Sequence, residues 1–197
     1  MTASRLTGDV LARVLVVAAT DRELAPSEGW LVLRCGVGPV EAAAATAAAL
    51  VAHRPLAVLH VGIAGARRGS GLAPPDVVVG TDSIYCDLGV PETWAPHRLV
   101  AAPDLVNAVC RAWPAASRHP IGTSARVGST SNCLVEAMEG FGVLRAAALA
   151  GLPAIEVRVI SNDIEETDRA KWRFDEAFKT IQAVTAALVQ ELATCVR

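Results

Sequence analysis

Long hydrophobic runs are missing from this sequence, although 52% of its 197 residues are hydrophobic. No apolar run approaches the ~20 uninterrupted residues that a membrane-spanning helix needs. The longest candidate, residues 40–52, is alanine-rich and has Glu41 and His53 at its ends. The first thirteen residues, MTASRLTGDVLAR, also lack the apolar segment of a secretory signal. We therefore expect a cytoplasmic protein with no membrane partner.

The sequence also lacks an excess of charge and a paired cysteine motif. Its 18 basic and 20 acidic residues give a formal net charge of −2, so no nucleic-acid partner is expected. The cysteines are odd in number and form no CxxC motif, which argues against a disulfide framework or a zinc site. No metal and no cofactor are expected. All five cysteines are predicted to be small buried thiols: Cys35, Cys86, Cys110, Cys133 and Cys195.

Strand-like and helix-like segments alternate along the whole chain. Apolar β-branched runs predict strands at residues 13–19, 30–35, 56–61, 76–85, 119–127 and 154–160. Helical patterns fall at residues 39–53, 103–113, 139–149 and from 170 onward, and a surface loop is expected at 88–98. Glycines at 62–65 are expected to close the third strand. The alternation implies a layered α/β fold, and the length favours a single domain, residues 1–197.

Polar clusters follow several of these strands, at the edge where open α/β sheets bind their ligands. They are TDRE at 20–23, VEAMEG at 135–140 and SND at 161–163. A single carboxylate in such a place is usually a helix cap or a solvated charge. Three clusters together with the glycines at 62–65 favour a ligand site.

The motifs, in order along nearly the whole chain, resemble those of the nucleoside phosphorylase/hydrolase superfamily and, within it, the futalosine hydrolases of the alternative menaquinone route. The glycine turns alone are common, whereas the spacing of MEG, ISN and DRxxW is more specific. The similar segments are ATDREL at 19–24, CGVGPV at 35–40, HVGIAG at 60–65, LAPPDVVV at 72–79, YCD at 85–87, VEAMEG at 135–140, ISN at 160–162, and DR at 168–169 with Trp172. The resemblance implies a three-layer α/β/α sandwich with a central mixed, twisted sheet. It also implies an N-glycosyl hydrolase that forms a homodimer or a higher homo-oligomer and binds a purine nucleoside.

The resemblance implies roles for residues on the sugar side. Met138 and Glu139 are expected to line the ribose, with Glu139 accepting hydrogen bonds from its 2′- and 3′-hydroxyls. Glu23 matches the acid that positions and deprotonates the attacking water. Gly62 and Ala64 belong to the segment expected to pass close to the sugar.

Asn162 falls on the position that contacts the leaving purine, with Ser161 and Val135 expected beside it. Adenine-specific relatives carry an aspartic acid at this position. An amide can instead donate to O-6 of hypoxanthine and accept from a protonated N-7. Mispairing a buried polar group costs ~1–3 kcal/mol, which selects between purines by ~10- to 100-fold. The sequence therefore predicts hydrolysis of futalosine to hypoxanthine and dehypoxanthine futalosine, with Glu23 and Asn162 as catalytic residues.

Several alternatives stay open. Asn162 could cap the next turn while Asp163 does the catalytic work. By the same resemblance, Asp168, Arg169 and Trp172 are expected to anchor the final helix and a lid over the purine, with a direct ligand role for these residues as the alternative.

The region 90–126 is short for the superfamily, and residues 128–133 offer no aromatic ring to stack on the base. Other functions also fit. These are a phosphorylase using Arg22 and Arg67, a nucleosidase for inosine or methylthioadenosine/adenosylhomocysteine, and a non-catalytic purine-nucleoside binder.

Overall fold

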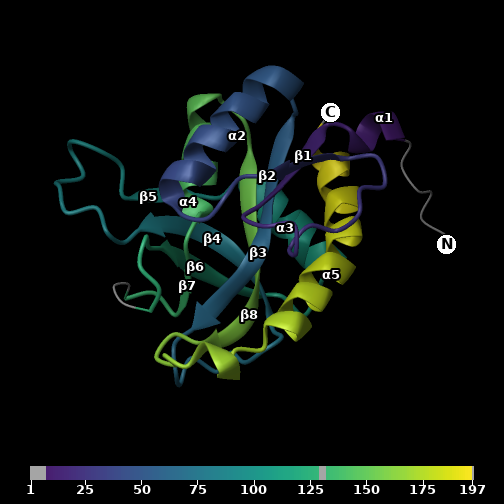
Figure 1. Ribbon diagram of the computed structural model, residues 1–197. Helices are drawn as coiled ribbons and strands as arrows, with labels where there is room; N and C mark the ends of the chain where they lie inside the picture. The colour runs from purple at the N-terminus through teal and green to yellow at the C-terminus, as the bar shows by residue number, and fades with distance from the viewer. Residues whose placement is uncertain (1–7, 129–131, 197) are drawn as a thin grey trace.

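The computed structural model in Figure 1 describes residues 8–128 and 132–196. Its strands belong to one eight-stranded mixed sheet. The strands are β1 (Val14–Ala18), β2 (Leu31–Arg34), β3 (Ala57–Ala66), β4 (Val77–Tyr85), β5 (Arg98–Val100), β6 (Ser117–Thr123), β7 (Val135–Ala137) and β8 (Ala154–Asp163). The helices are α1 (Gly8–Leu11), α2 (Pro39–His53), α3 (Pro103–Ala112), α4 (Gly140–Leu149), the short 3₁₀ turn η1 (Arg169–Lys171) and α5 (Phe174–Cys195).

The sheet curls until part of it closes on itself. Its order is β2-β1-β3-β7-β6-β4-β5, and β8 pairs with both β3 and β4. The strands β3, β8, β4, β6 and β7 therefore form a closed circuit, from which β1 and β2 extend on one side and β5 on the other. Register shifts interrupt β3 at Ala64/Gly65 and β4 at Gly80/Asp82. Such irregularities bend strands and increase their twist, which the closure requires.

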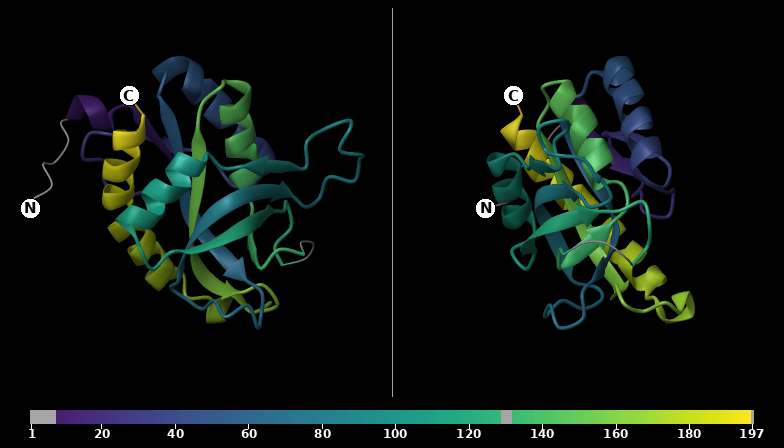
Figure 2. Two further views of the ribbon diagram at one scale, coloured as in Figure 1. Left: turned by 180° about the vertical axis from the view of Figure 1, so that it is seen from behind. Right: turned by 90° about the vertical axis from the view of Figure 1, so that its left-hand side faces the viewer.

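Helices cover both faces of the sheet, as the edge-on view in Figure 2 shows. Along β1, Val14 and Val16 pack in the core that α5 and α3 cover, while Leu15 and Val17 pack beneath α2 and α4. A strand that alternates between two apolar layers is buried throughout, which explains why its sequence reads as one continuous hydrophobic run. The predicted three-layer α/β/α fold is confirmed.

The boundaries differ from the sequence prediction in a few places. The strand from residue 56 does not end at the glycines: β3 continues through Gly62 and Gly65 to Ala66 because β8 pairs with it along this length. The strand expected at 119–127 lies at Ser117–Thr123. The short strands β5 and β7 were not predicted, since three residues carry too little periodicity to be recognised.

The cysteine prediction was partly wrong. The five thiols are free, but only Cys35 is buried, and Cys195 lies on the exposed side of α5 near its end. No helix among residues 8–128 and 132–196 is long and apolar enough to cross a membrane.

Candidate active site

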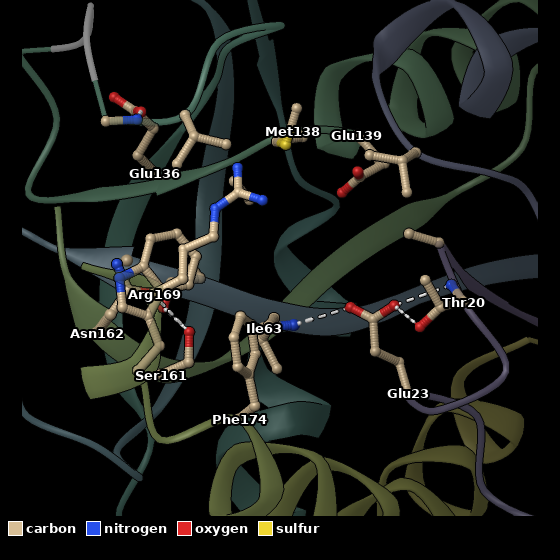
Figure 3. A pocket seen from close by; sticks show the side chains of 18 of the residues that line it. Thr20, Glu23, Ile63, Glu136, Met138, Glu139, Ser161, Asn162, Arg169 and Phe174 are labelled. Carbon is tan, nitrogen blue, oxygen red and sulfur yellow. Dashed lines mark hydrogen bonds between the residues drawn. The ribbon is translucent and has the colours of Figure 1, made fainter. Parts of the chain in front are cut away.

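A cavity of about 400 Å³ lies beyond the carboxyl ends of β1, β3 and β8. This is the edge at which parallel strands of α/β sheets present ligand-binding loops. Its walls come from the segment after β1, from β3, from the segment that begins in β7, and from β8 with the residues that follow it. The first turns of α5 complete the wall. Figure 3 shows Glu23 and Glu139 on one side of this cavity and Asn162 on the other.

Glu23 is held rigidly at the sheet edge. Its Oε2 accepts hydrogen bonds from the backbone N of Thr20 at 2.9 Å and from the Thr20 hydroxyl at 2.8 Å. Its Oε1 accepts from the backbone N of Ile63 at 3.2 Å. Burial raises the pKa of the Glu23 carboxyl above its ordinary value of 4.5, and the positive charge of Arg158 offsets only part of this. A buried carboxylate with a raised pKa is suited to act as a base.

Glu139 is the second buried carboxylate of the cavity, and two groups distant in sequence hold it. Its Oε1 accepts from the backbone N of Gly38 at 3.1 Å, at the amino end of α2. That end of a helix carries partial positive charge and favours an anion. Its Oε2 lies 3.3 Å from Nη2 of Arg158. Glu139 and the neighbouring Met138 both line the cavity, and their contact with a ribose stays a prediction.

Behind these carboxylates lies a buried ionic cluster that sequence analysis missed. Arg158 is fully buried; its Nε donates to Glu156 at 2.7 Å, and its Nη2 lies within 3.3 Å of both ring nitrogens of His60. Burial opposes the charge on Arg158, but the carboxylates of Glu156, Glu139 and Glu23 outweigh it and raise the pKa of the guanidinium. Burial and the same guanidinium lower the pKa of His60 well below 6.5. Arg158 is therefore a permanent cation behind the two cavity carboxylates.

A signal for this cluster was present in the sequence. Glu156 and Arg158 stand two residues apart in EVRVIS, a strand covered on both faces, so their side chains point to the same side. Charged residues are almost never fully buried unless they are paired. Two opposite charges inside a buried strand therefore indicate an internal ion pair.

At Gly62 the buried ionic cluster around Arg158 lies next to Glu23. A Cβ at this position would overlap Nη1 of Arg158 and lie 2.8 Å from Oε1 of Glu23. Nη1 itself has no hydrogen-bond partner among the described residues. A donor of Arg158 and an acceptor of Glu23 thus converge on one glycine, where a side chain would displace one or both of them.

Asn162 lies at the opposite side of the cavity and is almost fully buried. Its Oδ1 accepts from the Ser161 hydroxyl at 2.7 Å, and its Nδ2 donates to the backbone carbonyl of Asp163 at 2.8 Å. An amide has two N–H donors and two acceptor lone pairs. One donor and one lone pair therefore remain for a ligand, which the predicted contact with a 6-oxopurine requires.

Aromatic side chains form part of the cavity wall although residues 128–133 supply none. Trp172, Phe174 and Phe178 line the cavity, and successive ring centroids lie 5.3 and 5.9 Å apart. Their helical spacing within the segment from residue 170 onward predicts that Phe174 and Phe178 lie on the apolar, buried face of the last helix. In the structure α5 begins beyond the edge of the sheet, so its first turns face the cavity and not the core.

The remaining predicted residues divide into two groups. Ala64, Ser161 and Trp172 line the cavity, as does Arg169, whereas Gly62, Val135 and Asp163 do not. Val135 is buried in a separate core cluster, and Asp163 pairs with Arg68 at 3.4 Å. Within the segment 128–133, residues 129–131 lie outside the described part of the chain.

The two arginines considered for a phosphate lie elsewhere. Arg22 pairs with Asp175 at 2.7 Å, and Arg67 pairs with Glu165 at 3.4 Å; neither lines the cavity. Among the described residues, no three histidine, cysteine or carboxylate side chains are grouped so as to hold a metal ion.

Comparison with known proteins agrees with this geometry. Residues 27–132, more than half of the chain, match the family described as the phosphorylase superfamily. The chain belongs to that superfamily. It is 35% identical over 195 residues to the futalosine hydrolase of Streptomyces coelicolor, covering 84% of this chain and 80% of that protein.

Solved structures of the superfamily share the fold. The S-adenosylhomocysteine nucleosidase of Streptococcus pyogenes, in complex with 5-methylthiotubericidin, superposes with a TM-score of 0.80 at 21% identity. The alignment covers 91% of this chain and 96% of that one. A futalosine hydrolase mutant of Helicobacter pylori has a TM-score of 0.80 at 16% identity, covering 90% of this chain and 98% of that one. These structures show the shared fold. The family match and the 35% identity to a futalosine hydrolase make the chain a nucleosidase, an N-glycosyl hydrolase of the phosphorylase superfamily.

Proposed function

We propose that this nucleosidase hydrolyses the N-glycosidic bond of futalosine and releases hypoxanthine and dehypoxanthine futalosine. The observation that carries the proposal is the placement of an amide, Asn162, across the cavity from the buried carboxylates Glu23 and Glu139. The similarity to a futalosine hydrolase over most of the chain supports it.

The sugar side of the cavity supplies the nucleophile. Glu23, which lines the cavity, takes a proton from a water molecule that binds its carboxylate there. Glu139 accepts hydrogen bonds from the ribose hydroxyls, and Arg158 fixes its orientation from behind. As the glycosidic bond stretches, positive charge grows on the sugar, and carboxylates aimed at a charge that exists only in the transition state accelerate the reaction.

The base side of the cavity selects the purine. The free N–H of Asn162 donates to O-6 of hypoxanthine, and its free lone pair accepts from N-7 when that atom is protonated. The 6-amino group of an adenine nucleoside would instead meet the N–H donor. This contact favours a 6-oxopurine nucleoside over methylthioadenosine.

Water is the proposed nucleophile in place of phosphate. A phosphorylase holds its anion with cations and backbone donors close to the sugar. Here Glu23 and Glu139 occupy that side, and both Arg22 and Arg67 point their guanidinium groups to surface carboxylates outside the cavity. A homodimer or higher homo-oligomer is part of the proposal by likeness to the superfamily alone.

The test is a product assay with four nucleosides: futalosine, inosine, methylthioadenosine and aminodeoxyfutalosine, each with and without inorganic phosphate. We expect futalosine to give hypoxanthine and a free sugar hemiacetal at a rate that is independent of phosphate. Formation of a sugar 1-phosphate would identify a phosphorylase. Preferred cleavage of methylthioadenosine would contradict the selectivity, and binding without turnover would identify a nucleoside binder.

A further inference from the structure

Arg169 is the one cation among the described residues that line the cavity. The same wall carries three carboxylates, those of Glu23, Glu136 and Glu139. Figure 3 shows the guanidinium of Arg169 extending into the cavity from the side of Asn162, opposite Glu23. Glu23 and Glu139 therefore lie at the sugar side of the cavity, whereas Glu136 and the cation Arg169 lie toward the base side.

The guanidinium of Arg169 has no ion-pair partner in the part of the chain that the structure describes. Within residues 8–128 and 132–196 no side chain forms an ion pair with it, whereas Arg67, Arg68 and Lys171 nearby are all paired. Its neighbour is the ring of Trp172, whose centroid lies 5.8 Å from Cζ. An arginine over an aromatic face keeps its in-plane donors available for a ligand.

Hydrogen bonds on both sides of Arg169 hold the turn that carries it. Arg169 begins η1, and the side chain of Asp168 caps that turn by accepting from the backbone N of Ala170 at 3.0 Å. The indole N–H of Trp172 donates to the carbonyl of Glu166 at 3.0 Å, which closes the same turn from its other end. The turn is thus braced on both sides of Arg169, although the residue itself is exposed to solvent.

We propose that the guanidinium of Arg169 binds the departing 6-oxopurine and stabilises the negative charge that the base acquires as the glycosidic bond breaks. The proposal rests on the proposed function. The C1′–N9 bond breaks with its electron pair passing to the purine, whose charge spreads to N-7 and O-6. The oxygen of water forms the new bond to C1′, and its proton passes to Glu23. The purine anion is later protonated at N-7 from solvent, and Asn162 then accepts a hydrogen bond from that N–H.

Two features of the cavity make a cation necessary at the base side. Most of the lining there is apolar or aromatic, which disfavours an uncompensated anion. Glu136 lies on the same side, with its Oε1 3.1 Å from the backbone N of Gly128, and its charge further opposes an anionic base. A guanidinium at this place offsets both effects.

The experiment compares two leaving groups. Futalosine releases a base that develops negative charge, whereas futalosine methylated at N-7 releases a neutral base. Removing the charge in Arg169→Met is expected to lower kcat for futalosine by about 10- to 100-fold, the range for a hydrogen bond to a charged group. The same variant is expected to cleave the methylated compound within about 2-fold of the wild type, because no anion forms.

Two further variants control the measurement. Arg169→Lys keeps the charge and is expected to recover part of the loss for futalosine. Lys171→Met removes a neighbouring charge in the same turn, which pairs with Glu166 at 3.3 Å and does not line the cavity. It is expected to leave both rates unchanged.

An equal loss on both substrates in Arg169→Met would overturn the proposal, whether it arose from a distorted turn or from contact with another part of the nucleoside. A second measurement is independent of turnover. Calorimetry of free hypoxanthine, over the pH range in which it loses a proton, is expected to show tighter binding of the anion to the wild type and not to Arg169→Met. If the wild type cleaved neither nucleoside, the proposed function would fail, whereas a lack of preference for anionic hypoxanthine would overturn the role of Arg169.

Discussion

The backbone of Gly62 lies directly against the guanidinium of Arg158, so closely that a methyl group at position 62 would overlap Nη1. The same methyl group would lie 2.8 Å from Oε1 of Glu23. Gly62 does not line the cavity, yet it allows the buried cation and the proposed base to approach one another. Substitution here therefore tests the placement of Glu23 against Arg158 without removing any polar group.

Gly62→Ala is expected to lower kcat/KM by ~100-fold, since a displacement of about 1 Å in a catalytic group can have that effect. Overpacking is also expected to lower the free energy of unfolding by ~1–3 kcal/mol. Steady-state kinetics and urea denaturation measure the two effects. Gly89→Ala is the matched control, because a Cβ at position 89 meets no atom within 4 Å. Unchanged kinetics in Gly62→Ala would contradict the convergence of Glu23 and Arg158 at this glycine.

The convergence at Gly62 also shows what a sequence can and cannot predict. The apolar runs gave the order of strands and helices, and the acids and amide of the cavity were found because they follow those runs at the sheet edge. The partners of these groups could not be found in this way. Glu139 binds the amide of Gly38, 101 residues away, and Arg158 meets Gly62 through the register of β3 against β8. Register between distant strands is a property of the folded sheet and leaves no local pattern.

Phe174 and Phe178 illustrate a second limit. Their helical spacing matches that of Ile181 and Leu188, which are core residues, so periodicity alone assigns all four to one buried face. Where a helix overhangs the end of the sheet, the same face borders a cavity. The spacing predicts which side of the helix is apolar, but not how far the sheet beneath it extends.

Glu23→Gln removes the proposed base while keeping the shape of the side chain. The amide can still accept through its oxygen from Thr20 or Ile63, so the fold is expected to persist. Turnover is expected to fall by ~10²–10⁴-fold, the usual contribution of a general base, while the nucleoside still binds. Single-turnover assays and calorimetry separate these effects. Glu28→Gln, at an exposed position, is the control. Retained turnover would remove Glu23 from the mechanism.

The pH dependence of kcat/KM provides a separate test of Glu23. The base acts in its ionised form, and burial raises its pKa above 4.5, so activity is expected to decline with falling pH at a midpoint above 4.5. The Thr20 hydroxyl hydrogen-bonds the carboxylate and lowers this pKa. Thr20→Val is therefore expected to move the acid limb to higher pH. An acid limb below 4.5, or a downward shift in the variant, would be inconsistent with this assignment.

Asn162→Asp tests purine selection. An ionised carboxylate repels O-6 of hypoxanthine, and a protonated one can donate to N-7 of adenine and accept from its amino group. The ratio of kcat/KM for futalosine to that for aminodeoxyfutalosine is expected to change by ~10- to 100-fold in favour of the 6-amino compound. Asn107→Asp, at an exposed position in α3, controls for the added charge. An unchanged ratio would mean that Asn162 does not read position 6 of the base.

In the buried ionic cluster, loss of the guanidinium is expected to destabilise the fold more than loss of one carboxylate. Arg158→Met leaves Glu156 and Glu139 without the guanidinium that both contact, and the free energy of unfolding is expected to fall by ~3–5 kcal/mol. Glu156→Gln removes one of three carboxylates around a single guanidinium. Oε2 of Glu156 has no hydrogen-bond partner among the described residues. The free energy of unfolding is therefore expected to fall less in Glu156→Gln than in Arg158→Met. Urea denaturation is expected to place Glu156→Gln well above Arg158→Met in stability.

The stability of Glu156→Gln relative to the wild type is expected to depend on pH in a definite direction. Burial raises the pKa of Glu156 in the folded state above 4.5, so the folded protein binds this proton more strongly than the unfolded chain does. The stabilisation from protonating Glu156 is complete below 4.5 and is lost as the pH rises through the folded-state pKa. Glutamine does not titrate, and the stability of Glu156→Gln relative to the wild type is therefore expected to increase as the pH rises above 4.5. A relative stability that stayed constant above pH 4.5 would show that Glu156 is ionised throughout, held by Arg158 strongly enough to overcome its burial.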